Sequence, residues 1–402
     1  MATMHALVST LSLFAAFDIV TDSRDELAEM LRAWTAAAER LMAGLPAGLI
    51  GPVGGRPELP PDDTGEALDL DTANLTITIG FGPGMFRDDN GNDRFGLAER
   101  QPKVLRPLPR FPLDTLIEGT SGGDICIQAC ADDPQIAVHA IRNLTRIGFG
   151  SVGMRWSQHG FGRSSSTTRH QTTPRNLMGF KDGTANIRAE DTEELDTHVW
   201  VAADDDPADW LSDGSYLITR RAAITVETWD RQTLRDQEAF IGRTKGEGAP
   251  LTGDREFDDP DFTEKTVDGP TIPEDAHIRI VHPDNHGGVQ MLRRGYNIAD
   301  GTNEIGRMDG VDVAILGRPP RRPRPGVDLR GHVRAGRGRR RGDVTAPTDT
   351  SGGRARRRSS APIPQPSGCV QPSRRPRRTS RRGRGSGTGR PPRPAQPRCR
   401  RG

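Results

Sequence analysis

The chain has 402 residues, of which 27% are charged and 33% hydrophobic, and its formal net charge is +2. This length predicts two or three domains and is sufficient to bury a core. No apolar run approaches the ~20 residues of a membrane-spanning helix, and four scattered cysteines exclude a scaffold built on disulfides.

The small net charge conceals two segments of opposite sign. Residues 311–402 contain 26 arginines against four aspartates, about +22, and have no Lys, Phe, Tyr or Trp. Residues 1–310 hold the remaining 30 basic and 50 acidic residues, about −20. Because the basic segment cannot bury enough apolar surface to offset the entropy of ordering, residues 311–402 are predicted to form a disordered tail.

The first predicted elements are a strand and a helix. Residues 13–20 form an apolar run, and Ser23 with Glu26 makes a capping box after it. Apolar residues then recur at helical spacing as far as Leu41, which predicts a helix with one buried face. Trp34 lies on that face and is interpreted as a core residue.

Three further strands and a second helix complete the first half. Strands are predicted at 75–79, 124–130 and 152–157 from their apolar alternation. Asp133-Pro134 starts a helix between the last two strands. This order of elements predicts a ferredoxin-like α+β domain over residues 1–162.

Several residues of the first half resemble functional groups but are assigned to structure. Cys126 and Cys130 fall on one strand face about 13 Å apart, which is too far for a disulfide. His139 has no partner at metal-ligand spacing and is interpreted as packing or surface. Residues 80–84 lack the features of a dinucleotide loop, and residues 88–93 lack the glutamate of a calcium loop.

The second half begins to repeat this architecture. It predicts a second, incomplete ferredoxin-like domain over residues 163–310. The expected elements are strands at 198–202, 216–219, 223–229, 277–281 and 289–294, and a helix at 230–241.

A glycine-rich loop at residues 176–186 carries the most distinctive pattern of the chain. Gly179 and Gly183 bracket Asp182, and an asparagine stands at each end of the loop. Glycines permit backbone angles and close approaches that direct such a carboxylate at a ligand. From spacing alone, the alternative is a solvated turn.

The eleven residues of this loop resemble the Gly-x-x-Asp-Gly motif of dye-decolorizing (DyP-type) haem peroxidases, and most closely the exported deferrochelatase branch. The resemblance covers roughly three quarters of the chain and implies two ferredoxin-like domains and one haem b per chain. Five further segments agree in the same order, at residues 13–20, 74–81, 123–128, 277–279 and 293–296.

The resemblance implies a role for each matching residue. His277 takes the place of the proximal haem ligand and is the metal ligand, while Asp182 and Arg293 take the distal catalytic places. A single imidazole suits haem because the porphyrin supplies the other four donors; without the resemblance, His277 is an ordinary strand histidine. The other residues implied in cofactor binding, besides Arg293, are Gly179, Phe180, Lys181, Gly183 and Thr184.

The same resemblance implies a reaction. Hydrogen peroxide binds opposite His277, Asp182 moves a proton between its oxygens, and Arg293 stabilises the developing charge. Small organic molecules donate the electrons. Electrons could pass through Trp200, Trp229 or Tyr296, and the alternative for each of them is a role in core packing. Asp309 is a candidate hydrogen-bond partner of His277.

Two alternatives to a peroxidase stay open. One is an iron-release (deferrochelatase) protein with little peroxidase turnover, working with iron-uptake machinery. The other is a product whose reading frame shifts near residue 310, because Arg, Pro, Gly and Ala then replace the apolar elements of the family. If the basic tail is genuine, it predicts nucleic-acid binding.

Location and assembly follow only from the resemblance. It implies export to the periplasm, the cell envelope or the medium, and a homo-oligomer. The start of the chain lacks a basic segment before its first apolar run, so a genuine start predicts a cytoplasmic protein.

Overall fold

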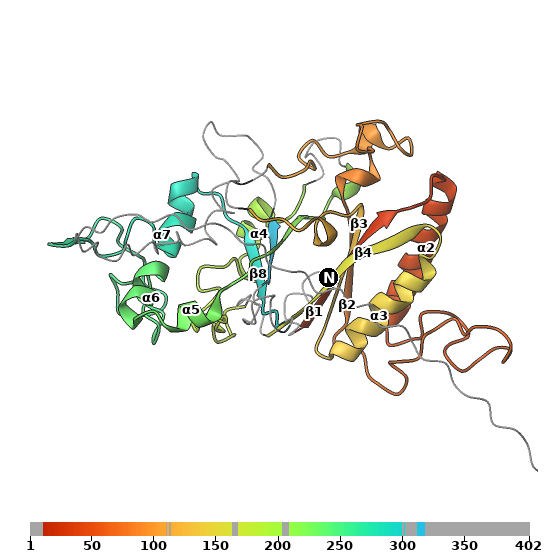
Figure 1. Cartoon of the computed structure of the whole chain (residues 1–402), viewed down its shortest axis with the longest axis horizontal. Coiled ribbons are helices and arrows are strands. Elements are labelled where there is room, and N and C mark those ends of the chain that lie inside the picture. The colour runs from red at the N-terminus through yellow and green to blue at the C-terminus, as the bar shows by residue number, and fades with distance from the viewer. Residues whose placement is uncertain are drawn as a thin grey trace, which may run out of the picture. The chain divides into compact units, whose positions relative to one another are not determined.

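The computed structural model describes residues 11–109, 111, 114–162, 168–202, 209–299 and 301, and the backbone of 312–317. Within these ranges the first half forms one antiparallel sheet in the order β2-β3-β1-β4. Helices α2 and α3 cover the same face of that sheet (Figure 1). The elements are β1 (Leu11–Ile19), α2 (Arg24–Met42), β2 (Thr76–Phe81), β3 (Ile125–Ala131), α3 (Pro134–Ile147) and β4 (Val152–Phe161). The predicted ferredoxin-like domain is thus confirmed.

The core of this domain lies between the two helices and the sheet. Trp34 is fully buried and meets the ring of Phe17 edge-on, with 5.4 Å between the ring centroids. Its indole N–H donates to the Leu144 carbonyl at 2.7 Å, which joins α2 to α3. The interpretation of Trp34 as a core residue is therefore confirmed.

The start of α2 uses the predicted cap with one different partner. The Ser23 hydroxyl accepts the backbone N–H of Glu26 at 3.3 Å, as the capping box requires. The Glu26 carboxylate, however, accepts the hydroxyl of Thr21 at 2.5 Å. The Thr21 hydroxyl in turn accepts the N–H of Ser23 at 3.0 Å, so it links Ser23 to the Glu26 carboxylate.

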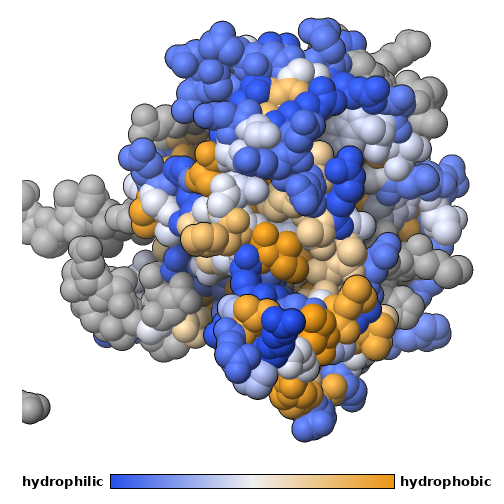
Figure 2. All heavy atoms as spheres, turned by 90° about the vertical axis from the view of Figure 1, so that its right-hand side faces the viewer, coloured by the Kyte–Doolittle hydropathy of each residue, from blue (hydrophilic) through white to orange (hydrophobic). Residues whose placement is uncertain are grey.

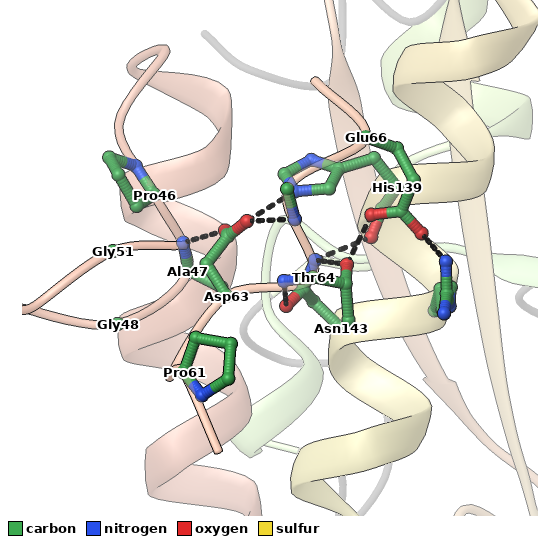
Figure 3. Close-up of polar contacts among 12 residues, drawn as sticks. Pro46, Ala47, Gly48, Gly51, Pro61, Asp63, Thr64, Glu66, His139 and Asn143 are labelled. Atoms are coloured by element: carbon green, nitrogen blue, oxygen red, sulfur yellow. Dashed lines mark hydrogen bonds and ion pairs between the residues drawn. The ribbon is translucent and has the colours of Figure 1, made fainter. Parts of the chain in front are cut away.

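His139 has a buried partner that the sequence did not indicate. Its ring lies on α3, and its Nε2 atom is 3.0 Å from Asp63 Oδ1. The Asp63 carboxylate also accepts the backbone N–H groups of Ala47 and Gly65, each at 2.7 Å (Figure 3). Asp63 is 2% exposed and His139 is 5% exposed, so packing is the correct alternative for this histidine.

We expect Asp63→Ala to lower the free energy of unfolding by roughly 2–4 kcal/mol, because two buried N–H groups and an imidazole lose their acceptor. Thermal and denaturant unfolding of both proteins measure this change. Asp71→Ala is the control, since the exposed Asp71 carboxylate accepts only the N–H of Ala73. Equal losses for the two variants would contradict the proposed importance of the buried acceptor.

The same variant has a defined pH dependence. Burial raises the pKa of Asp63, but hydrogen bonds from Ala47, His139 and Gly65 outweigh it, and the net pKa lies below its ordinary value of 3.8. A carboxylate with a lowered pKa stabilises the fold above its unfolded pKa and loses that contribution as the pH falls. The difference between wild type and Asp63→Ala should therefore shrink below about pH 4.

The two cysteines of the sheet are free thiols. Cys130 is buried, and burial raises the pKa of Cys126 to about 12. A thiol with such a pKa stays protonated at neutral pH and is a poor nucleophile. The free thiols agree with the prediction that Cys126 and Cys130 form no disulfide.

The segment between α2 and β2, residues 43–75, presents large apolar side chains to solvent. Figure 2 shows apolar side chains gathered on the face that lies on the right of Figure 1. The exposed ones in this segment are Leu45, Leu49, Ile50, Val53, Leu59, Leu68 and Leu70. Among the residues that the structure describes, no helix combines the length and apolar character of a membrane span.

The second half has a smaller sheet of three antiparallel strands in the order β5-β9-β8. Its elements are α4 (Thr192–His198), β5 (Tyr216–Arg221), α5 (Val226–Asp230), α6 (Leu234–Ile241), α7 (His277–Val281), β8 (Leu292–Tyr296) and β9 (Asp312–Gly317), with a two-stranded ribbon of β6 (Lys265–Thr266) and β7 (Gly269–Pro270). The central strand, β9, lies in the segment that the sequence assigned to the disordered tail. Residues 318–402 lie outside the described residues, so the tail and frameshift hypotheses stay predictions.

Several predicted elements of the second half are wrong in type. Residue 198 is the last residue of α4 and residues 199–202 follow it, residues 226–229 belong to the short helix α5, and residues 277–281 form α7. A five-residue apolar alternation fits one helical turn as well as a strand, and tertiary packing decides between them. In α7, the buried Ile278 faces Gly242, where an added Cβ would lie 2.7 Å from Ile278.

Candidate active site

The glycine-rich loop folds around the side chain of Asn176. Its Oδ1 atom accepts the backbone N–H groups of Met178 at 3.1 Å and Phe180 at 3.3 Å. Its own N–H donates to the Phe180 carbonyl at 3.0 Å. Gly179 has a φ of 81°, and an added Cβ would lie 2.8 Å from the Lys245 side chain. The loop is thus an ordered turn that needs glycine at this position.

The middle of the loop is anchored by aromatic packing. Phe180 is 2% exposed, and Trp229 meets it edge-on with 6.0 Å between ring centroids. The Trp229 indole N–H donates to the Met178 carbonyl at 3.1 Å. The Lys245 ammonium lies 5.6 Å from the centroid of the Phe180 ring. The side chain of Phe180 therefore fixes the loop to the neighbouring segment.

The structure brings together the two residues predicted to be distal catalytic groups. Arg293 Nη2 and Asp182 Oδ1 form an ion pair, and the side chains are 33% and 13% exposed. Asn176 Nδ2 also donates to Asp182 Oδ2 at 3.4 Å. The Asp182 N–H donates to the Pro174 carbonyl at 2.8 Å, which holds its backbone. The loop thus directs its carboxylate at an arginine and not at bulk water.

Asn186 fixes the backbone of Arg293 from the far end of the same loop. Its Oδ1 atom accepts the Arg293 N–H at 2.9 Å, and its Nδ2 atom donates to the Arg293 carbonyl at 2.9 Å. One carboxamide therefore satisfies both backbone groups of the residue opposite Asp182. The sequence offered a signal for this role, because an asparagine stands at each end of the loop.

Arg293 remains positively charged throughout the pH range in which proteins normally function. Burial lowers the pKa of its guanidinium to about 10. A third of the side chain still contacts solvent and the Asp182 carboxylate faces it, and both conditions favour the charged form. Arg293 can therefore stabilise negative charge that develops beside Asp182.

Two loop residues predicted to bind the cofactor, Lys181 and Thr184, contact the carboxylate of Glu256. Lys181 Nζ lies 2.5 Å from Glu256 Oε2, and the Thr184 hydroxyl donates to Glu256 Oε1 at 3.0 Å. Burial raises the pKa of Glu256, but hydrogen bonds from these two residues and the Lys181 charge contribute to a net pKa below its ordinary value. Sequence reasoning missed Glu256, which lies in the acidic stretch of residues 254–263.

His277 is the first residue of α7 and is partly buried between Ala276 and Ile278, which are buried. Three contacts hold residues 279 and 280 of α7. Arg279 Nη1 donates to the Ile272 carbonyl at 3.0 Å, and the Asn285 amide donates to the Arg279 carbonyl at 2.5 Å. His286 Nε2 lies 2.6 Å from the Ile280 carbonyl oxygen. The suggested partner of His277, Asp309, lies outside the described residues.

The chemistry of these groups fits haem better than a metal ion bound by protein alone. Within the described part of the chain, no group of three or more His, Cys, Asp and Glu side chains is arranged to hold a metal ion. Haem needs only one protein ligand, and His277 supplies a partly buried imidazole. The Asp182–Arg293 ion pair supplies a proton carrier and a cation, which suit chemistry on a bound oxygen ligand.

The three candidate electron relays occupy different surroundings. Trp200 packs against the cluster that contains Ile187 and Leu195. The Tyr296 hydroxyl accepts a bond from Arg294 Nη2 at 2.5 Å and lies 3.7 Å from Cys130 Sγ. Trp229 contacts the glycine-rich loop itself, through Phe180 and Met178.

Both halves of the chain match known family models. The model described as Dyp-type peroxidase, N-terminal, matches residues 6–162, and Dyp-type peroxidase, C-terminal, matches residues 173–310. The Deferrochelatase of Escherichia coli (strain K12) is 35% identical over 301 residues, which are 74% of this chain and 69% of the relative.

Solved structures agree with these matches. A DyP-type peroxidase from Streptomyces coelicolor is 36% identical with a TM-score of 0.69, over 79% of this chain and 81% of that chain. The oxyferrous complex of DtpA from Streptomyces lividans is 35% identical with a TM-score of 0.68, over 79% and 82%. The two family models together cover both halves of the chain, and the second includes the glycine-rich loop.

Proposed function

The chain belongs to the DyP-type peroxidase family, and from that premise we propose that it reduces hydrogen peroxide and oxidises small organic donors with one haem b bound per chain. The family resemblance inferred from the sequence is confirmed. The ion pair between Asp182 and Arg293 carries the proposal, because it places a proton carrier beside a fixed cation.

In this proposal, each residue has one task. His277 would hold the iron of haem through its imidazole, and haem would supply the electrons for cleaving peroxide. Asp182 would take a proton from one oxygen of hydrogen peroxide and deliver it to the other. Arg293 stabilises the negative charge that grows on the departing oxygen.

The surroundings of Asp182 suit this proton transfer. Arg293 and the Asn176 amide both favour its ionised form, which is the form that accepts a proton. The Asp182 side chain is 13% exposed, so it has limited contact with solvent. Asn186 fixes the position of Arg293 relative to the loop, because its carboxamide bonds both the N–H and the carbonyl of Arg293.

We expect the peroxidase rate of the haem-loaded chain to be highest at acid pH. A carboxylate with a reference pKa near 3.9 still accepts protons where a histidine base is already protonated. Steady-state rates with hydrogen peroxide and an organic dye between pH 3 and 9 test this. An optimum above about pH 8 would contradict Asp182 as the base.

A second candidate function is iron release from haem, which the similarity to the Escherichia coli Deferrochelatase favours. The two functions separate in one experiment with Asp182→Asn. The substitution should remove peroxide turnover, whereas iron release does not need a proton carrier for peroxide. Iron-free porphyrin is detected by its fluorescence in the same samples.

A further inference from the structure

Glu256 lies outside the glycine-rich loop and contacts two of its residues. It is 7% exposed, and its carboxylate faces the loop across a sequence separation of more than 70 residues. One oxygen pairs with Lys181 and the other accepts from Thr184. These two residues stand immediately before Asp182 and two places after it, so a single carboxylate holds both sides of Asp182.

The backbone around Glu256 is itself fixed. Arg243 Nη1 donates to the carbonyls of Glu256 and Gly248, both at 2.8 Å. The other end of the loop is joined to the same segment by Arg175, which donates to the carbonyls of Gly179 at 2.8 Å and Lys245 at 2.6 Å. The segment 243–256 therefore forms a support on which the loop is held by two side chains, Arg175 and Glu256.

We propose that Glu256 is a positioning residue for Asp182, acting through Lys181 and Thr184. With both neighbours of Asp182 held, the loop has little freedom to rotate its carboxylate away from Arg293. Removing the Glu256 carboxylate releases both neighbours at once, while Asn186 still holds Arg293. The expected result is a loop that keeps its fold but presents Asp182 less accurately.

The charge of Glu256 supports this role in acid. The hydrogen bonds and the ion pair that lower its pKa keep it ionised at pH values where ordinary carboxylates begin to protonate. The contact to Lys181 is partly buried on both sides, with side chains 15% and 9% exposed, so salt screens it less than a surface pair. The support thus persists in the acid range where turnover is expected.

The test compares Glu256→Gln with Asp114→Asn, a control that alters another buried ion pair, between Asp114 and Arg220. The inference rests on the proposed peroxidase function. We expect Glu256→Gln to lower kcat roughly 10- to 100-fold, with little change in the KM for peroxide, since small misplacements of a catalytic group have costs of this order. The control should keep kcat within about twofold of wild type, because Asp114 and Arg220 both lie outside the glycine-rich loop.

A double variant separates positioning from a general loss of structure. If Glu256 acts through Asp182, adding Glu256→Gln to Asp182→Asn causes no further loss of kcat. A further loss equal to that of the single Glu256→Gln variant would overturn the proposal. Thr184→Val, which leaves the Lys181–Glu256 pair in place, should give a smaller loss of the same kind and serves if Glu256→Gln folds poorly.

Amide hydrogen exchange of the chain without haem gives a readout that does not depend on turnover. The Asp182 N–H bonds to Pro174 and the Asn186 N–H bonds to Gly183, so both report on the loop. We expect their exchange to rise several-fold in Glu256→Gln and to stay unchanged in Asp114→Asn. Unchanged exchange would overturn the positioning role, whereas faster exchange in a chain whose wild type has no peroxidase activity would refute only the proposed function.

Discussion

Replacing His277 by alanine is expected to abolish specific haem binding. The imidazole is the one protein ligand that the proposal gives to the iron, and haem without an axial histidine loses the spectrum of that coordination. Because even changes to groups behind a metal ligand cost about 10- to 100-fold in affinity, loss of the ligand itself should cost more than about 100-fold. Titration of the purified chain with haem, followed by visible absorption, measures both spectrum and affinity.

The control for this titration is His282→Ala. His282 follows α7 directly, is partly exposed, and stacks edge-on with Phe262 at 5.1 Å between ring centroids. Its loss alters the residue that caps the same short helix without removing the proposed ligand, so the wild-type spectrum should persist. A histidine-type spectrum in His277→Ala would show that another residue holds the iron. The absence of any specific spectrum in wild type would reject haem binding by this polypeptide.

The first domain could be predicted because its signals are local. The Ser23 cap, the helical spacing as far as Leu41 and the Asp133-Pro134 start each act within a few residues, and the structure contains the corresponding elements. The strands β1, β3 and β4 are 9, 7 and 10 residues long, which is longer than one helical turn, so their apolar patterns can be distinguished from a helical one. A helix over residues 24–42 and one over 134–147 then leave few arrangements of the sheet.

The second domain was harder to predict because its elements are short. Residues 277–281 make only one turn, and their pattern agrees with either type of element. The choice is made by Ile278, which packs into a cluster with Ile272 and Ala276. Such contacts depend on the tertiary fold and leave no periodic trace in the sequence.

The residues around the site divide in the same way. Asp182, Arg293 and His277 could be named because they stand in motifs that a family resemblance identifies. Glu256 and Asp63 could not, because each carboxylate contacts a side chain more than 70 residues away. An acidic residue in a polar stretch is usually solvated, so nothing local distinguishes a buried support from a surface charge.

Asp182→Asn is expected to reduce peroxide turnover by roughly 100- to 10,000-fold, the range found when a positioned acid–base group is lost. Asparagine has nearly the same shape and still contacts Arg293 and Asn176, so the loop and the haem spectrum should be preserved. Stopped-flow mixing of the haem-loaded variant with hydrogen peroxide measures the reaction directly. Asp191→Asn is the control, since that carboxylate pairs with the exposed Arg169 and should leave the rate unchanged.

The pairing of Asp182 with Arg293 predicts that the effects of substituting the two residues are not independent. If the two groups act on the same oxygen–oxygen bond, Arg293→Leu alone should lose roughly 100- to 1,000-fold, as when a donor to a developing charge is removed. The double variant Asp182→Asn/Arg293→Leu should then lose much less than the product of the two single effects, because each side chain also orients the other. Multiplicative losses would mean that the ion pair seen between them has no part in catalysis, and that each residue contributes from a separate position.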